Sequence, residues 1–195
     1  MQVITALYVN RNIMAERKYK KLFSGLIDVC YSQFYIESED PDDSDSCEEQ
    51  FQGQNNGLCG AATPERIFFT ARPKDSVIDL DINLYTENPE INDEYTDIVE
   101  VSFRPGEEPV FLCQWAHEEV YPLNLENFDY RVRYSIVGLD NDYDYDEDDD
   151  EYFQKPVPGQ KYLIEIWPQE KSRDQIVKQT SMEAAYWHKE WGSRK

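Results

Sequence analysis

The chain is short of cations, and this shortage excludes several classes of partner. Its 195 residues hold nineteen Lys and Arg against forty Asp and Glu, a formal net charge of −21 at pH 7. The charge is uneven: residues 1–24 carry +4, residues 171–195 carry +3, and residues 25–170 carry −28. Such a body repels nucleic acids and anionic membranes but attracts basic proteins and metal cations. We therefore expect no direct nucleic-acid or membrane partner.

Cysteine is also scarce, and its pattern bears on compartment and metal binding. The four cysteines form no C-x-x-C pair, so their spacing does not predict a zinc site. Cys30 and Cys113 fall in apolar strand-like runs and are interpreted as buried thiols, whereas Cys47 and Cys59 flank a loop that oxidation would close. The apolar run at the N-terminus precedes its basic residues, the reverse of a secretory signal, and no run has the length of a membrane span. We expect a cytoplasmic protein.

Catalytic motifs are missing as well. The two histidines, His117 and His188, lie far apart in the sequence, and the chain has no G-x-S-x-G, no phosphate-binding glycine loop and no H-E-x-x-H. Carboxylates are too abundant for any pair of them to indicate acid–base catalysis. We expect no enzyme activity and no cofactor.

What the chain does have is enough apolar material for a core, arranged as short strands. Hydrophobic residues make up 40% of the sequence, with fourteen Tyr, nine Phe and four Trp. Strand-like patterns recur between turn signals, which is typical of an antiparallel sandwich or barrel. The predicted strands are residues 26–36, 66–71, 77–85, 97–103, 110–115, 121–125, 129–138 and 162–167.

These patterns predict a single domain, 1–195, with a mainly antiparallel β-sandwich as its body. The expected parts are a basic N-terminal segment, 1–24, which is helix-prone from residue 13; the sandwich, 26–168; two long acidic loops, 37–60 and 139–156; and a C-terminal α-helix, 172–191, with Ser172 as N-cap.

Arg131 and Arg133 point to one face of the strand predicted at 129–138. Two adjacent guanidinium groups can bind a phosphate or a carboxylate, but the thirty-six acids of residues 25–170 favour internal ion pairs. The four Trp are interpreted as core or helix-docking residues, with an exposed aromatic patch as the alternative.

The most unusual feature is the acid run of residues 140–151, in which nine of twelve side chains are carboxylates. Residues 37–50 repeat the theme with eight in fourteen. We expect both stretches to bind a basic partner surface. The predicted partner-binding residues are Asp42, Asp43, Asp45, Asp140, Asp142, Asp144, Asp146, Glu147, Asp148, Asp149, Asp150 and Glu151.

Three interpretations of the acid run stay open. Asp140, Asp142, Asp144 and Glu151 occupy positions 1, 3, 5 and 12 of an EF-hand-like loop, although Tyr145 stands where the turn needs glycine. Alternatively, an extended chain rises about 3.3 Å per residue and a DNA strand presents a phosphate about every 3.4 Å, so the run can mimic DNA. Third, the run is a solvated insertion with no partner.

Several segments resemble known bacterial proteins. Residues 129–134, 162–168 and 179–188 are similar to uncharacterised proteins with a strand-rich body and a closing helix. The strand order, which opens with Val29-x-Tyr31-x-Gln33-Phe34, resembles the competence-associated nuclease inhibitor family over residues 26–168. That resemblance implies a small β-sandwich that blocks a nuclease, and this chain departs from it in the acidic loops and the C-terminal helix.

The sequence thus predicts a non-enzymatic acidic binding or inhibitor protein that engages a basic surface, by mimicry of nucleic acid at a nuclease or other DNA-binding protein. The alternatives are a divalent-cation (Ca²⁺) binding module and a structural component of a larger assembly.

Overall fold

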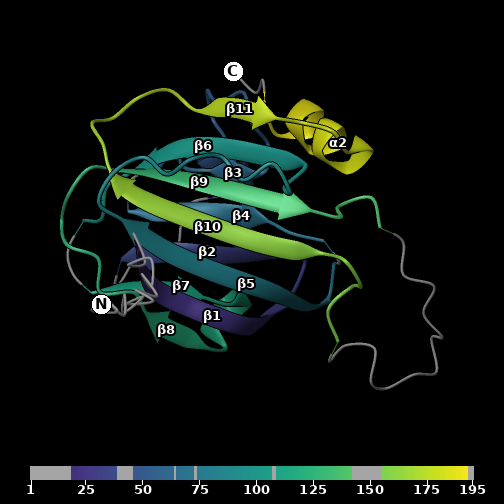
Figure 1. The fold of residues 1–195 in the computed structure, drawn as a ribbon, viewed down its shortest axis with the longest axis horizontal. Helices are drawn as coiled ribbons and strands as arrows, with labels where there is room; N and C mark the ends of the chain where they lie inside the picture. Colours follow the sequence, from purple (N-terminus) through teal and green to yellow (C-terminus); the bar gives the residue numbers. More distant parts are fainter. Residues whose placement is uncertain are drawn as a thin grey trace, which may run out of the picture.

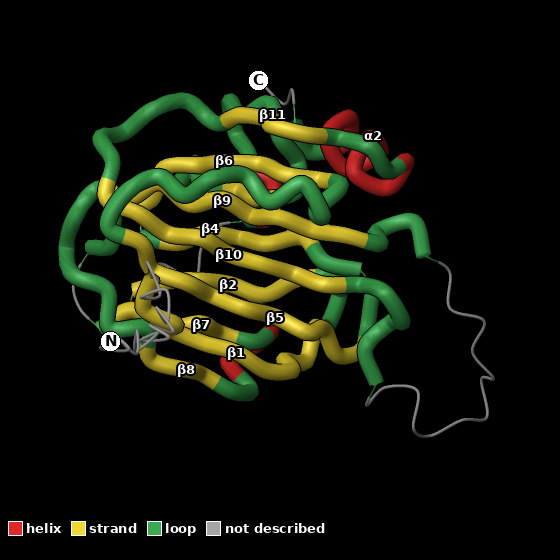
Figure 2. The backbone as a smooth tube through the Cα atoms, in the orientation of Figure 1, coloured by secondary structure: helices red, strands yellow, loops and turns green. Residues whose placement is uncertain are grey.

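The computed structural model describes residues 19–38, 46–63, 65–72, 74–106, 109–141 and 155–192, which build two facing β-sheets (Figures 1 and 2). This arrangement confirms the predicted mainly β sandwich. In the order of their hydrogen bonding, the strands of the larger described sheet are β1 (Tyr19–Val29), β5 (Ser76–Tyr85), β10 (Lys161–Pro168), β9 (Tyr130–Val137), β6 (Asp97–Phe103) and β11 (Gln175–Lys178). Those of the smaller sheet are β3 (Cys59–Gly60), β4 (Arg66–Thr70), β2 (Gln33–Ser38), β7 (Val110–Cys113) and β8 (Val120–Pro122).

Helices are short in the described part of the chain. They are α1 (Cys47–Gln50), the 3₁₀ turn η1 (Trp115–His117) and α2 (Met182–Glu190). Ser46 and Glu49 form a capping box that begins α1 within the loop predicted at 37–60. None of the described helices is long and apolar enough to cross a membrane.

The core lies between the two sheets and follows from the alternation of the strands. On β5, Ile78, Leu80 and Ile82 are buried in it, whereas Asp79 is exposed on the opposite face. Aromatic rings join the layers: the Tyr134 ring of β9 packs against Phe69 of β4 at 5.0 Å, and its hydroxyl donates to the carbonyl of Thr70.

The pairing is antiparallel with one exception. Strands β5 and β10 run parallel at the centre of the larger sheet, with Leu80 opposite Tyr162 and Leu84 opposite Ile166. Strands β9 and β10 are antiparallel neighbours, so the acid run departs from the end of one central strand and returns to the start of the next. The run is therefore an insertion between two adjacent strands.

Two predictions near the N-terminus are wrong. Residues 26–36 are not one strand, because Tyr31 and Ser32 adopt left-handed backbone angles (φ 52° and 62°) in the turn between β1 and β2. Residues 19–23, predicted to continue a helix, belong to β1, where they pair with β5. Pairing with a neighbouring strand outweighs the weak helical pattern of this segment.

The C-terminal helix is shorter than predicted. Residues 175–178 form strand β11, in which Ile176 pairs with Val99 at the edge of β6. The helix begins only at Met182, with Ser181 rather than Ser172 as its N-cap. The β-branched pair Ile176 and Val177 favours a strand where a free sheet edge is available.

Candidate partner-binding surface

Eleven of the twelve predicted partner-binding carboxylates lie outside the described residues, and their role stays a prediction. They are Asp42, Asp43, Asp45, Asp142, Asp144, Asp146, Glu147, Asp148, Asp149, Asp150 and Glu151. The described exception is Asp140. An EF-hand loop joins two helices, whereas this run joins strands β9 and β10, so the EF-hand interpretation of Asp140, Asp142, Asp144 and Glu151 does not fit the fold.

Asp140 attaches the start of the acid run to helix α2. Its carboxylate accepts the backbone N–H groups of Met182 at 2.8 Å and of Glu183 at 3.0 Å. These are N–H groups of the first turn, which have no partner inside the helix. A carboxylate at this end of a helix is further stabilised by the helix dipole. The first residue of the run therefore caps a helix.

Three further contacts hold the same corner. The Ser181 hydroxyl accepts the N–H of Ala184 at 3.0 Å, as an N-cap does. Buried Asp97 accepts the N–H groups of Thr180 and Ser181 at 2.8 and 3.0 Å. Arg72 donates to the carbonyl of Leu139 at 3.1 Å, which links the end of the β9 segment to the body. The point at which the acid run leaves the described structure is thus fixed.

Helix α2 packs closely on the loop at residues 55–57. The Nδ1 atom of His188 accepts the N–H of Gly57 at 2.9 Å, and a Cβ atom on Gly57 would lie 1.9 Å from the carbonyl oxygen of Trp187. Only glycine fits such a close approach. The rings of Phe51, Trp191 and Trp187 stack in series, with centroids 5.6 and 6.3 Å apart. Trp187 and Trp191 are therefore helix-docking residues, as predicted.

The opposite side of α2 leaves two large side chains in solvent. Met182 is 80% exposed and Tyr186 is 52% exposed. Both belong to the helix whose first turn binds Asp140, and Figure 1 places α2 at the end of the sandwich toward which β9 points. An exposed Met and Tyr beside the origin of the acid run match the aromatic patch that the sequence left as an alternative.

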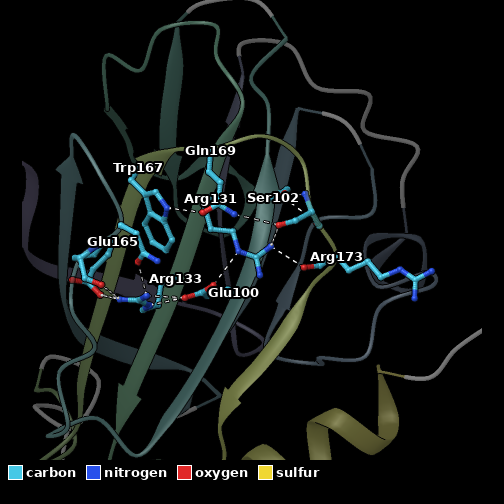
Figure 3. Close-up of polar contacts among 11 residues, drawn as sticks. Glu100, Ser102, Arg131, Arg133, Glu165, Trp167, Gln169 and Arg173 are labelled. Atoms are coloured by element: carbon cyan, nitrogen blue, oxygen red, sulfur yellow. Dashed lines mark hydrogen bonds and ion pairs between the residues drawn. The ribbon is translucent and has the colours of Figure 1, made fainter.

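Arg131 and Arg133 are buried in ion pairs on the outer face of the larger sheet (Figure 3). Glu100 lies between them and contacts Arg131 at 3.1 Å and Arg133 at 2.8 Å. Arg133 also pairs with Glu165 at 3.3 Å and lies over the Trp167 ring. The prediction of internal ion pairs is confirmed.

The same two arginines hold the segments that cover this face. Arg131 donates to the carbonyl of Arg173 at 2.9 Å, and Arg133 donates to the carbonyl of Pro89 at 3.0 Å and the side chain of Asn88 at 2.9 Å. Burial raises the pKa of Glu165, and Arg133 counteracts part of that effect. The network is a structural device that joins two loops to the sheet.

Sequence reasoning overlooked a described acidic segment at residues 87–94. Its four carboxylates, Glu87, Glu90, Asp93 and Glu94, are all exposed. Lys178 fixes its backbone by donating to the carbonyls of Asp93 and Tyr95 at 3.2 and 2.7 Å. Four acids in eight residues were the available signal, but the two denser acidic stretches drew attention away from it.

A buried carboxylate on the outer face of the smaller sheet gathers a second polar cluster. Glu37 of β2 is 1% exposed and accepts a 2.6 Å bond from the Nε atom of Arg66 on β4. Its other oxygen pairs with Nε2 of His117 on η1, and the Cys113 thiol of β7 also hydrogen-bonds to it. Among the described residues, Glu37, Cys113 and His117 are the group with the donor atoms to hold a metal ion.

The thiols of the described structure are protonated at neutral pH. Burial raises the pKa of Cys59 well above its ordinary value, and burial together with Glu37 raises that of Cys113. All four cysteines are free, so the Cys47–Cys59 bridge is not formed. Cys113 is buried as predicted, whereas Cys30 is only partly buried.

Comparison with known proteins shows the fold. ComJ from Bacillus subtilis, an inhibitor of the DNA-degrading activity of NucA, superimposes with a TM-score of 0.51 at 18% identity, over 77% of this chain and 98% of ComJ. The structure described as crocagin biosynthetic gene J gives a TM-score of 0.49 at 14% identity, over 75% of this chain and 96% of its own. No family model and no curated protein matches the sequence. The resemblance to a nuclease-inhibitor fold, expected from the sequence, is confirmed.

Proposed function

We propose that this chain is a non-enzymatic inhibitor that binds the basic DNA-binding surface of a nuclease or of another DNA-binding protein. Two observations support this function. The fold is similar to that of a protein that inhibits the DNA-degrading activity of a nuclease. The net charge of −21 is complementary to a surface built to bind phosphates.

The acid run supplies the mimicry in this proposal. Residues 140–151 carry nine carboxylates, and an extended chain spaces residues at about 3.3 Å, close to the roughly 3.4 Å between phosphates of one DNA strand. A DNA-binding groove lined by Lys and Arg offers cations at a matching density. The run attracts that groove over a distance and then occupies part of it.

The observation that carries the proposal is the bond between Asp140 and the first turn of α2. It brings the origin of the run next to the exposed side chains of Met182 and Tyr186. Charge alone gives steering and an increased association rate, whereas a slow dissociation needs desolvated apolar or aromatic contacts. The run and the exposed face of α2 together provide both kinds of contact.

Two variants that remove equal charge test the proposal. The run variant converts Glu147, Asp148, Asp149 and Asp150 to the corresponding amides, and the loop variant does the same at Glu87, Glu90, Asp93 and Glu94. Each removes four negative charges, so any effect of net charge alone is the same in both. Each protein is immobilised and incubated with an extract of the source organism, and the DNA-degrading activity of the unbound fraction is measured.

We expect the wild-type protein and the loop variant to deplete the activity, and a high-salt wash to release it. Four exposed ion pairs of about 0.2–1 kcal/mol each weaken binding by about tenfold when removed, so the run variant depletes little. Undiminished activity with the wild-type protein contradicts an inhibitor of a nuclease. Equal depletion by both variants contradicts the role of the run.

A further inference from the structure

The cluster around Glu37 holds three donor atoms of different chemical types in one place. A carboxylate oxygen of Glu37, the Sγ atom of Cys113 and a ring nitrogen of His117 all lie within 4.8 Å of one another. They come from β2, β7 and η1, which are brought together by the pairing of Tyr35 with Cys113 and by the turn that follows β7. We propose that these three residues form a zinc site.

The donor set suits zinc better than calcium or magnesium. Zinc binds cysteine sulfur, histidine nitrogen and carboxylate oxygen, whereas calcium and magnesium take oxygen ligands almost exclusively. A tetrahedral zinc with bonds of about 2.0–2.3 Å separates neighbouring ligand atoms by about 3.5 Å. Small side-chain movements bring the three atoms to that spacing, and a water molecule completes the fourth position.

The site has both a protected interior and an opening. Glu37 and Cys113 are buried, which shields their bonds to the ion from water. The His117 side chain is 44% exposed and stands at the mouth, where an ion enters from solvent. The ion replaces the hydrogen on His117 that bridges to Glu37, because a metal bound to Nε2 requires that nitrogen without its proton.

The backbone at the mouth is held in an unfavourable conformation. Ala116 and His117 both adopt left-handed angles, with φ of 53° and 55°, although neither is glycine. Such outliers cluster at ligand-binding positions, where the surrounding structure imposes them. Here they aim the imidazole at Glu37.

Arg66 is a positioning residue. Its Nε atom holds one oxygen of Glu37 at 2.6 Å and leaves the other oxygen directed at His117. Hydrogen-bonded partners of this kind orient a ligand and are part of most metal sites. On binding, the Cys113 thiol and the His117 ring release their protons to solvent, and the thiolate and carboxylate together cancel the charge of the ion.

This site is separate from the acid run and goes beyond the proposed inhibitor function. The run contains only oxygen donors and Tyr side chains, whereas the cluster contains sulfur. A sulfur-specific signal therefore distinguishes binding at the cluster from association of cations with the acidic surface.

The test is a titration of the full chain, freed of metal by a chelator and kept in a thiol-free reductant, with Co²⁺ as a spectroscopic substitute for zinc. We expect near-ultraviolet thiolate-to-cobalt absorption and intense visible bands of tetrahedral cobalt that saturate at one equivalent. One equivalent of Zn²⁺ removes both signals. Absence of the thiolate signal in the wild-type protein overturns the proposal.

Four variants assign the signal. Cys113→Ser abolishes the near-ultraviolet absorption, and His117→Gln, a change at an exposed side chain, weakens cobalt binding beyond the roughly tenfold that loss of an outer partner costs. Cys47→Ser and the run variant serve as controls and keep the wild-type titration. A signal that survives in Cys113→Ser and His117→Gln, both folded by circular dichroism, overturns the assignment.

Discussion

The Nδ1 atom of His188 accepts a hydrogen bond from the backbone N–H of Gly57 across 2.9 Å and thereby joins helix α2 to the loop at residues 55–57. An acceptor nitrogen carries no proton, so the ring is neutral with its hydrogen on Nε2. Burial lowers the pKa of His188 for the same reason, since a charged ring loses its hydration there. The attachment of α2 is therefore sensitive to acid.

The pH dependence of stability follows in sign. Because the pKa of His188 is lower in the folded chain than the ordinary 6.5, the unfolded chain binds more protons between these two values. We expect the urea midpoint to fall as pH decreases from 7.5 to 5.5. His188→Gln reduces this dependence, whereas the control His117→Gln retains it; an equal dependence in both variants would contradict the assignment.

Gly57→Ala tests the close contact between α2 and the body. The added Cβ lies 1.9 Å from the carbonyl oxygen of Trp187, so the helix has to shift, and overpacking of this kind costs about 1–3 kcal/mol. The free energy of unfolding, followed by tryptophan fluorescence, measures the loss. Gly25→Ala is the matched control, since its nearest contact is 3.7 Å from the new atom, and we expect a change within about 0.5 kcal/mol.

Arg133 and Arg104 form a matched pair for the ion-pair network. Replacement of buried Arg133 by Met leaves Glu100 and Glu165 without their shared cation, and we expect a loss of about 3–5 kcal/mol in the free energy of unfolding. Arg104 pairs with Asp129 on the surface at 3.3 Å, so Arg104→Met costs about 0–1 kcal/mol. Similar losses in chemical denaturation would show that burial does not govern these pairs.

Much of the sandwich could be predicted because its strands alternate strictly. Residues 97–103 were predicted with the observed bounds of β6, and the burial of Val132, Tyr134 and Ile136 on β9 follows from period-two patterning. The turn at Tyr31 and Ser32 was missed, since neither residue is one of the usual left-handed formers. Strand β11 was missed because its stability depends on the edge of β6, far away in the sequence.

The candidate site was predictable in composition but not in arrangement. The acid run is evident from the sequence, whereas the capping role of Asp140 depends on α2, which lies forty residues further on. The Glu37 cluster draws on β2, β4, β7 and η1, and no local spacing of Cys and His residues signals it. Contacts between distant segments are set by sheet pairing, which sequence periodicity does not specify.

Asp140 separates structural from functional carboxylates in the acid run. We expect Asp140→Ala to lower the free energy of unfolding by about 0.5–2 kcal/mol, the range for loss of a helix-capping side chain. The run variant, which leaves Asp140 intact, unfolds like the wild-type protein. If the run variant loses stability instead, the run is part of the folded core and the proposed binding role is undermined.

The most direct measurement is a competition between this protein and double-stranded DNA for the nuclease that it depletes. The nuclease, inactivated by a chelator, is held on the immobilised protein while DNA is added at low salt. Mimicry of DNA predicts that the two are mutually exclusive, so DNA releases the nuclease, and that binding weakens steeply as salt rises. A ternary complex of protein, nuclease and DNA, stable at the same salt concentration, would contradict the account.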